Sequence, residues 1–159
     1  MKIIKVQRCE QIIIKKNHPN FKVIDRQKKK KKNLYNEANY TLRQEFIKNG
    51  NYISYRQMNK DFKTHENYKL TFSQPANCTL RLLDKNWKSY FRAIKDWKNH
   101  PEKYSGMPKL PKYLKKNGRF PWMIPNNQCL YKYEKSTVHI GNRLVNDYEW
   151  KCRCLGRLI

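Results

Sequence analysis

Apolar residues recur at helical spacing between Gln74 and Asn99. They are Ala76, Leu80, Leu83, Trp87, Tyr90, Phe91, Ile94 and Trp97. The steps through positions 76, 80, 83, 87, 90, 94 and 97 alternate between four and three residues, which at about 100° per residue places these residues on one face of a helix. His100-Pro101 ends the pattern, because the residue before a proline is disfavoured in helical geometry. The sequence therefore predicts one long helix with an aromatic-rich buried face.

The same stretch carries a row of positive charges at steps of four, three, four and three residues. This basic row consists of Arg81, Lys85, Lys88, Arg92 and Lys95. On a helical wheel it is centred roughly 140° from the apolar face. Two interpretations stay open, a solvated face or a row that contacts an anionic partner. The aromatic residues Trp87, Phe91 and Trp97 are expected in the core rather than as platforms for base stacking.

A second helix is predicted from Asp25, a helix-capping residue type, to Asn49-Gly50, a typical helix end. Its apolar positions are Leu34, Ala38, Leu42 and Phe46, with Tyr35 and Ile47 beside them. Lys28 to Lys32 form a run of five lysines in its first half. Cations are unfavourable near the positive end of a helix dipole. The run is interpreted either as a solvated, frayed helix start or as a phosphate contact.

A third, short helix is predicted after Ser54, because Ser54-x-x-Gln57 has the pattern of a capping box. Its apolar side would hold Tyr55, Met58 and Phe62. Ser73 is expected to cap the long helix. With short connections and matching apolar faces, the three helices would form one compact unit.

Short apolar runs at both ends of the chain predict strands. The N-terminal runs are Ile3 to Val6, Ile12 to Ile14 and Phe21 to Ile24. A turn at His18-Pro19-Asn20 comes before the last of them. The C-terminal runs are Cys129 to Tyr133, Thr137 to Ile140 and Tyr148 to Cys154. Between helices and C-terminal strands lies a proline-rich, basic segment that contains Lys109 and Lys112. It can follow a phosphate backbone, or it can lie across the protein surface as a structured linker.

Composition favours a polyanionic partner. Among 159 residues there are 36 Lys and Arg against 12 Asp and Glu, a net charge of +24. Phosphates attract such charge regardless of sequence, so nucleic acid is the expected partner. The aromatic content of 13% is typical of a folded domain rather than a disordered basic tail. A membrane partner is disfavoured, because no apolar run approaches transmembrane length.

No pattern of catalytic or metal-binding residues is recognisable. The five cysteines form no regular framework, which favours reduced thiols in a cytoplasmic protein. Cys152-x-Cys154 lacks two further ligands for zinc, and strand positions are the favoured interpretation. Asp147 and Glu149 stand in a predicted turn, a context unsuited to a two-metal site. We therefore expect no catalytic residue, no metal and no cofactor.

Several motifs follow one another along the chain. They are Leu34-Tyr35-Asn36-Glu37-Ala38, Ile53-Ser54-Tyr55, the stretch from Leu80 to Phe91, the stretch from Gly106 to Lys112, Arg119-Phe120-Pro121 and Asn126-Asn127-Gln128. In this order they resemble the TnpB (OrfB) family of insertion-sequence proteins, the transposase-associated RNA-guided DNA endonucleases. The resemblance covers nearly the whole chain.

The resemblance implies a fold and a domain order. Family members have a small split β-barrel, the wedge domain, interrupted by a helical recognition domain. Residues 1–24 and 126–159 would be the wedge parts, residues 25–100 the recognition helices, and residues 101–125 the extended basic segment. The expected fold class is therefore α+β, a helical recognition bundle inserted in a small, incomplete wedge-type β-barrel.

The resemblance also implies a function, which this sequence would carry only in part. Family members continue into a RuvC-like nuclease domain with an acidic triad and a zinc ribbon, and neither is found in this sequence. We expect a truncated, non-enzymatic relative that binds guide-type RNA and target-flanking double-stranded DNA in the bacterial cytoplasm or nucleoid. Alternatives are a fragment completed by a separate nuclease chain, or a trans-acting regulator. The oligomeric state stays open.

The resemblance assigns binding residues by position. Tyr55, Ser73 and Asn77 match family positions that touch the DNA motif beside the target, and their polar groups could hydrogen-bond base edges. Each also has a structural interpretation, as core, helix cap and solvated residue respectively. The basic row, together with Lys109 and Lys112, would contact phosphates.

Overall fold

The computed structural model describes residues 13–124, with their side chains, and the backbone of residues 129–132, 137–140 and 149–151. The chain forms two compact units. One is Ile24–Met123, and the other combines Met1–Val23 with Ile124–Ile159. The larger unit holds most of the helical structure and all of the side chains discussed below.

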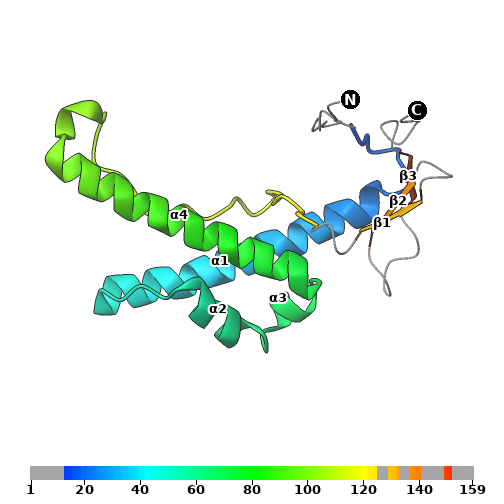
Figure 1. Ribbon diagram of the computed structural model, residues 1–159, viewed down its shortest axis with the longest axis horizontal. Helices are drawn as coiled ribbons and strands as arrows, with labels where there is room; N and C mark the ends of the chain where they lie inside the picture. Colours follow the sequence, from blue (N-terminus) through cyan, green and yellow to red (C-terminus); the bar gives the residue numbers. More distant parts are fainter. Residues whose placement is uncertain (1–12, 125–128, 133–136, 141–148, 152–159) are drawn as a thin grey trace, which may run out of the picture. The chain divides into compact units, whose positions relative to one another are not determined.

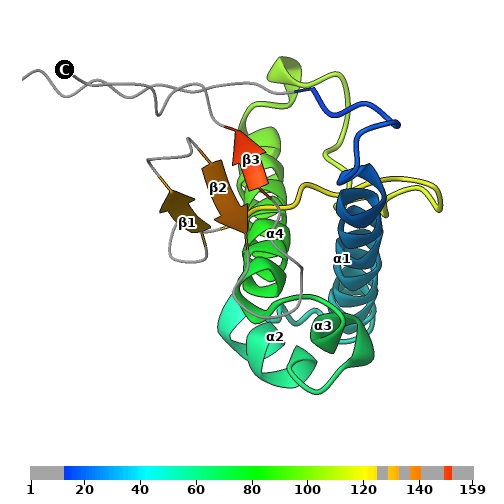
Figure 2. The same cartoon turned by 90° about the vertical axis from the view of Figure 1, so that its right-hand side faces the viewer.

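Two long helices, α1 (Phe21–Asn49) and α4 (Ser73–Asn99), lie side by side (Figure 1). They run in the same direction, since Tyr35 contacts Asn86 and Phe46 contacts Phe91 further along both helices. Because the two helices are parallel, the chain must run back from the end of α1 to the start of α4. The short helices α2 (Tyr55–Phe62) and α3 (Glu66–Lys69) make that return on one side of the pair (Figure 2).

The core lies between α1, α2 and α4. Its most deeply buried apolar residues are Leu34, Ala38, Leu42, Met58, Phe62, Ala76, Leu80, Leu83 and Trp87. Phe46, Tyr52, Tyr90 and Phe91 surround Trp87 with ring centroids 5.5 to 6.3 Å from the indole. Such edge-to-face and tilted pairs stabilise beyond the area they bury. The expectation that Trp87 belongs to the core is confirmed, while Trp97 is only partly buried.

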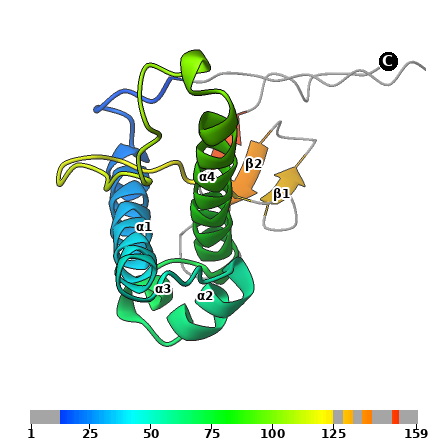
Figure 3. The ribbon, with the colours of Figure 1, turned by 90° about the vertical axis from the view of Figure 1, so that its left-hand side faces the viewer.

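After the short 3-10 helix η1 (Pro101–Lys103), an extended segment crosses back over the helix pair (Figure 3). Asn36 of α1 binds Leu114 twice: its Nδ2 donates to the Leu114 carbonyl at 2.9 Å, and its Oδ1 accepts from the Leu114 N–H at 2.8 Å. Asn39 donates to the Pro111 carbonyl at 3.0 Å and accepts from Trp87 Nε1, also at 3.0 Å. We call residues 107–120 the return segment. It is a structured linker held by asparagine side chains.

A small sheet belongs to the second unit. Strands β1 (Cys129–Lys132), β2 (Thr137–Ile140) and β3 (Glu149–Lys151) are antiparallel in the order β1-β2-β3. Cys129 stands opposite Ile140, and Thr137 stands opposite both Lys132 and Lys151. These strands fall within the three C-terminal segments for which the sequence predicts strands.

The prediction of an α+β fold with a wedge-type β-barrel is wrong. Helices make up 63% of residues 13–124, and no residue in that range belongs to a strand. Among all the described residues, the three short strands form one open sheet and no barrel. The larger unit is stabilised by helix packing and by the return segment bound to α1.

The strand predicted at Phe21 to Ile24 is also wrong, because these residues form the first turn of α1. The turn at His18-Pro19-Asn20 comes directly before, and Phe21 N–H donates to the His18 carbonyl at 2.9 Å. Asp25 lies inside the helix and pairs with Lys29 and with Arg119. A contact made by a residue far along the chain thus overrides the local strand preference.

Both helix starts predicted from serine caps can be checked. Ser54 caps α2, and its hydroxyl accepts from Gln57 N–H at 3.4 Å. Ser73 is not a cap, because Phe72 occupies that position and Ser73 is the first helical residue of α4. At the other end of α1, Gly50 adopts a φ of 69°, the left-handed conformation expected after Asn49.

Candidate nucleic-acid interface

The basic row lies on the outside of α4. All five of its residues, Arg81, Lys85, Lys88, Arg92 and Lys95, are exposed. The row extends for about 21 Å, at about 1.5 Å of rise per residue. Lys88 Nζ pairs with Asp84 at 2.7 Å. Within residues 13–124, the other four cations have no acidic partner, so their charge is available to an anion.

Two of the polar positions assigned by resemblance extend the basic row. Ser73, Asn77 and Arg81 are spaced by four residues and so lie on one ridge of α4. Ser73 is exposed. Asn77 Oδ1 accepts a hydrogen bond from the Tyr68 hydroxyl at 2.8 Å, which orients the Asn77 amide.

Tyr55 joins the same surface from α2. The Arg81 guanidinium lies over the Tyr55 ring, 5.1 Å from its centroid. This side-chain contact with Tyr55 raises the pKa of Arg81. A cation over an aromatic face is held in a defined position. The structure therefore brings Tyr55, Asn77 and Arg81 together at the N-terminal end of the basic row.

A carboxylate holds α2 against this end of α4. Asp84 Oδ1 accepts from the Tyr52 hydroxyl at 2.6 Å and from Tyr55 N–H at 2.9 Å, while Oδ2 faces Lys88. Burial raises the pKa of Asp84, but the hydrogen bonds from Lys88 and Tyr52 outweigh it and leave the pKa below its usual value. Asp84 therefore stays ionised and positions Tyr55 next to the basic row.

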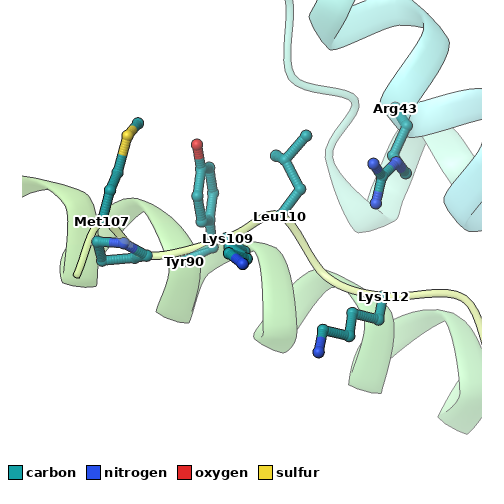
Figure 4. Close-up of a pocket in the computed structure, with 7 residues that line it drawn as sticks. Arg43, Tyr90, Met107, Lys109, Leu110 and Lys112 are labelled. Atoms are coloured by element: carbon teal, nitrogen blue, oxygen red, sulfur yellow. The ribbon is translucent and has the colours of Figure 1, made fainter. Parts of the chain in front are cut away.

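Lys109 and Lys112 are not part of this surface. They line a pocket of about 540 Å³ between α1, α4 and the return segment. Figure 4 shows Tyr90 on α4 beside Met107 and Leu110 of the segment, with Arg43 approaching from α1. Tyr90 lies roughly 180° around α4 from the centre of the basic row, at about 100° per residue. The predicted site residues thus divide between two faces of the molecule.

Arg43 and Tyr90 were missed as functional candidates by sequence reasoning. Tyr90 fits the apolar pattern of α4, and nothing local separates a pocket wall from a core residue. Arg43 had a detectable signal, because Asn36, Asn39 and Arg43 are spaced by three and four residues beside the apolar stripe of α1. A polar row next to a core face is typical of a surface that binds another chain segment.

The motif Leu34-Tyr35-Asn36-Glu37-Ala38 holds the fold together. Leu34 and Ala38 are fully buried, and the Tyr35 ring packs on Phe120 with centroids 4.8 Å apart. Glu37 accepts a hydrogen bond from Asn67 Nδ2 at 2.9 Å and lies 3.1 Å from His65 Nδ1. In this structure the motif connects α1 to α3 and to the return segment.

The lysine run from Lys28 to Lys32 lies in continuous helix. Lys29 pairs with Asp25 at 3.0 Å, and Lys32 Nζ donates to the Lys116 carbonyl at 3.0 Å. Lys31 is only 1% exposed, and its Nζ has no hydrogen-bond partner among the described residues. The run is therefore neither uniformly solvated nor uniformly available to phosphate.

The described residues offer no candidate for a metal site or a membrane span. No cluster of three or more metal-ligating side chains occurs among the described residues, which do not include Cys152 and Cys154. No described helix is long and apolar enough to cross a membrane. No protein-family model, curated protein or solved structure matches the chain.

Proposed function

We propose that this protein binds nucleic acid, with the basic row of α4 lying along a phosphate backbone. One observation carries the proposal: five exposed cations line the outer face of a helix whose opposite face is anchored in the core. A rigid row loses less conformational freedom on binding than the same charges on a flexible tail. The chain's net charge of +24 favours the same class of partner.

We infer that the partners are guide-type RNA from the same genetic element and the double-stranded DNA beside its target. This inference rests on the resemblance to the TnpB family. Tyr55, Ser73 and Asn77 would contact base edges, because they continue the basic row or lie beside it. The Asn77 Nδ2 donor is available to a base, since within residues 13–124 only its oxygen is engaged. The chain would supply binding and no nuclease centre of its own.

The basic row predicts a specific salt dependence. If the four cations without an acidic partner each neutralise one phosphate, the logarithm of the association constant should fall with the logarithm of salt concentration with a slope of about −3.6 for duplex DNA and about −2.8 for single strands. Fluorescence anisotropy with labelled strands at several salt concentrations measures both slopes. A slope near zero would contradict the electrostatic part of the proposal.

A matched pair of variants locates the contact. Lys85→Gln combined with Arg92→Gln removes two exposed cations of the row that have no acidic partner in residues 13–124, and should make the duplex slope about 1.8 units less steep. Lys48→Gln combined with Lys63→Gln removes two exposed lysines, one in α1 and one directly after α2. This control should leave the slope unchanged. Equal effects of the two pairs would show that charge matters without a defined surface.

RNA retention tests the finer assignment of partners. The chain is expressed together with its native genetic locus, washed at high salt, and the remaining RNA is sequenced. A discrete RNA from the end of the element is the expected result. A mixture of cellular RNAs that is lost with salt would contradict guide-type recognition.

A further inference from the structure

We propose that the pocket between α1, α4 and the return segment binds one unstacked nucleotide, with its base on the apolar wall and its phosphate at the cationic rim. The proposal rests on the proposed function, because it assumes a nucleic-acid strand as the ligand. It adds a second binding site, on a face of α4 that the basic row does not reach.

The lining of the pocket combines two chemistries. Tyr90, Pro108 and Leu110 supply an aromatic ring and apolar carbon, while Arg43, Lys109 and Lys112 supply positive charge. Within residues 13–124, no acidic residue lines the pocket. The volume of about 540 Å³ is within the usual range for small-molecule sites, about 300 to 1,000 Å³. A nucleotide matches both chemistries, since every base has a π-face that stacks on aromatic rings and is joined to a phosphate.

Arg43, one of the three cations at the rim, is held in place by the fold. Arg43 Nη1 donates to the Pro111 carbonyl at 2.9 Å, and the guanidinium lies over the Tyr113 ring, 5.0 Å from its centroid. Because a guanidinium has five N–H donors, others stay available for a phosphate. Asn39 binds the same Pro111 carbonyl and is itself bound by Trp87 in the core. The position of Arg43 is therefore set before a ligand arrives.

The apolar wall is equally fixed. Tyr90 packs against Phe46, Trp87 and Phe91, with ring centroids 5.4 to 6.5 Å away. Pro108 restricts the backbone of the segment opposite. A rigid aromatic platform of this kind favours stacking of a base without selecting its identity.

The rim of the pocket favours a nucleotide within a strand. Met107 is 59% exposed, and Lys109 and Lys112 are exposed as well. A strand can therefore enter and leave across the rim while one of its bases occupies the pocket. A free nucleoside monophosphate shares the same chemistry, and the test separates the two sources.

Two short single strands of equal length and charge provide the test, oligodeoxyadenylate and an abasic strand. Wild-type protein should bind oligodeoxyadenylate about tenfold more tightly than the abasic strand. Tyr90→Leu should remove this preference without weakening abasic binding, whereas Tyr90→Phe, which keeps the ring, should retain it. Adenosine monophosphate should compete only weakly.

Lysine variants test the rim. Lys109→Gln combined with Lys112→Gln should weaken binding of both strands and make the salt slope about 1.4 units less steep. Lys103→Gln combined with Lys115→Gln changes the same chain region outside the pocket and should leave the base preference and the slope unchanged. Duplex binding through the basic row should persist in the Tyr90 variants, which shows that they are folded.

The outcomes separate this proposal from the proposed function. Equal binding of the two strands by wild-type protein, or an unchanged preference in Tyr90→Leu, overturns the pocket assignment while duplex binding stands. Strong competition by adenosine monophosphate overturns the assignment to a strand. Failure to bind any nucleic acid overturns the proposed function itself.

Discussion

Replacing Asp84 by alanine is expected to lower the free energy of unfolding by about 3 kcal/mol or more. Asp84 is 7% exposed and accepts hydrogen bonds from the Tyr52 hydroxyl and the Tyr55 N–H. Hydrogen bonds to a buried, charged acceptor are worth roughly twice those between neutral groups. Alanine removes that acceptor, leaves both donors unpaired, and frees α2 from α4.

Urea denaturation followed by tryptophan fluorescence measures this loss. Asp96→Ala is the matched control, because Asp96 lies near the exposed end of the same helix and also accepts from a tyrosine, Tyr104, at 2.6 Å. Its loss should stay below about 1 kcal/mol, as is usual at exposed positions. Asp84→Asn retains an acceptor oxygen and should fall between the two. Similar losses for Asp84→Ala and Asp96→Ala would contradict the central role of Asp84.

Acid provides an independent check on Asp84. Its pKa is lowered from the usual 3.8, so the unfolded chain binds a proton at this side chain before the folded protein does. The stability from the ionised carboxylate is therefore present above about pH 4 and is lost as pH falls through the folded pKa. The difference in stability between wild type and Asp84→Asn should shrink in that range. A constant difference would contradict the assignment.

The helical part of the fold follows from the sequence where local signals and packing agree. The apolar spacing predicts a helix from Gln74 to Asn99, and α4 covers Ser73–Asn99. Asn49-Gly50 marks the end of α1, and Ser54 marks the start of α2. In each case the residue that signals the boundary also satisfies the backbone groups there, so the local pattern is sufficient.

The errors arise where distant contacts decide. Phe21 to Ile24 has the composition of a strand, but the helix that includes it is tied by Asp25 to Arg119 and by the Lys28 carbonyl to Phe120 N–H. No short-range pattern shows which segment will return to that place. The barrel prediction joined the apolar runs of residues 1–24 and 126–159 into the arrangement that the family has, and strand patterns do not show how strands close: the three described strands form one open sheet.

From the residues alone, the candidate site could be predicted only by its positive charges. The spacing of the basic row identifies it in the sequence. Asp84 is a single acidic residue among these cations, and no sequence pattern indicates its hydrogen bonds to Tyr52 and Tyr55. Lys109 and Lys112 were singled out for their charge, but their pocket depends on Arg43 and Tyr90 from two other elements. Charge can be counted from the sequence, whereas a pocket forms only when distant segments pack together.

Replacing Lys31 by methionine is expected to raise the free energy of unfolding by about 3 kcal/mol at neutral pH. Burial lowers the pKa of Lys31 from 10.5 to about 8, an effect that nearby Cys78 only partly opposes. Nζ has no hydrogen-bond partner among the described residues. Methionine retains most of the aliphatic volume and removes the charge. Lys30→Met, at the neighbouring, less buried position of the same run, should change stability by no more than about 0.5 kcal/mol.

The pH dependence identifies the charge of Lys31 as the cause. Between the folded pKa of about 8 and the unfolded value of 10.5, the unfolded chain binds more protons at this side chain, so wild-type stability rises with pH. Relative to Lys31→Met, wild type should gain about 2 kcal/mol between about pH 7 and pH 9.5. That window ends below the ionisation of the buried tyrosines, since burial raises the pKa of Tyr35 and of Tyr68. Urea denaturation of both proteins across this window measures the difference. A constant difference, or a destabilised Lys31→Met protein, would mean that Lys31 finds a counter-charge in the folded state.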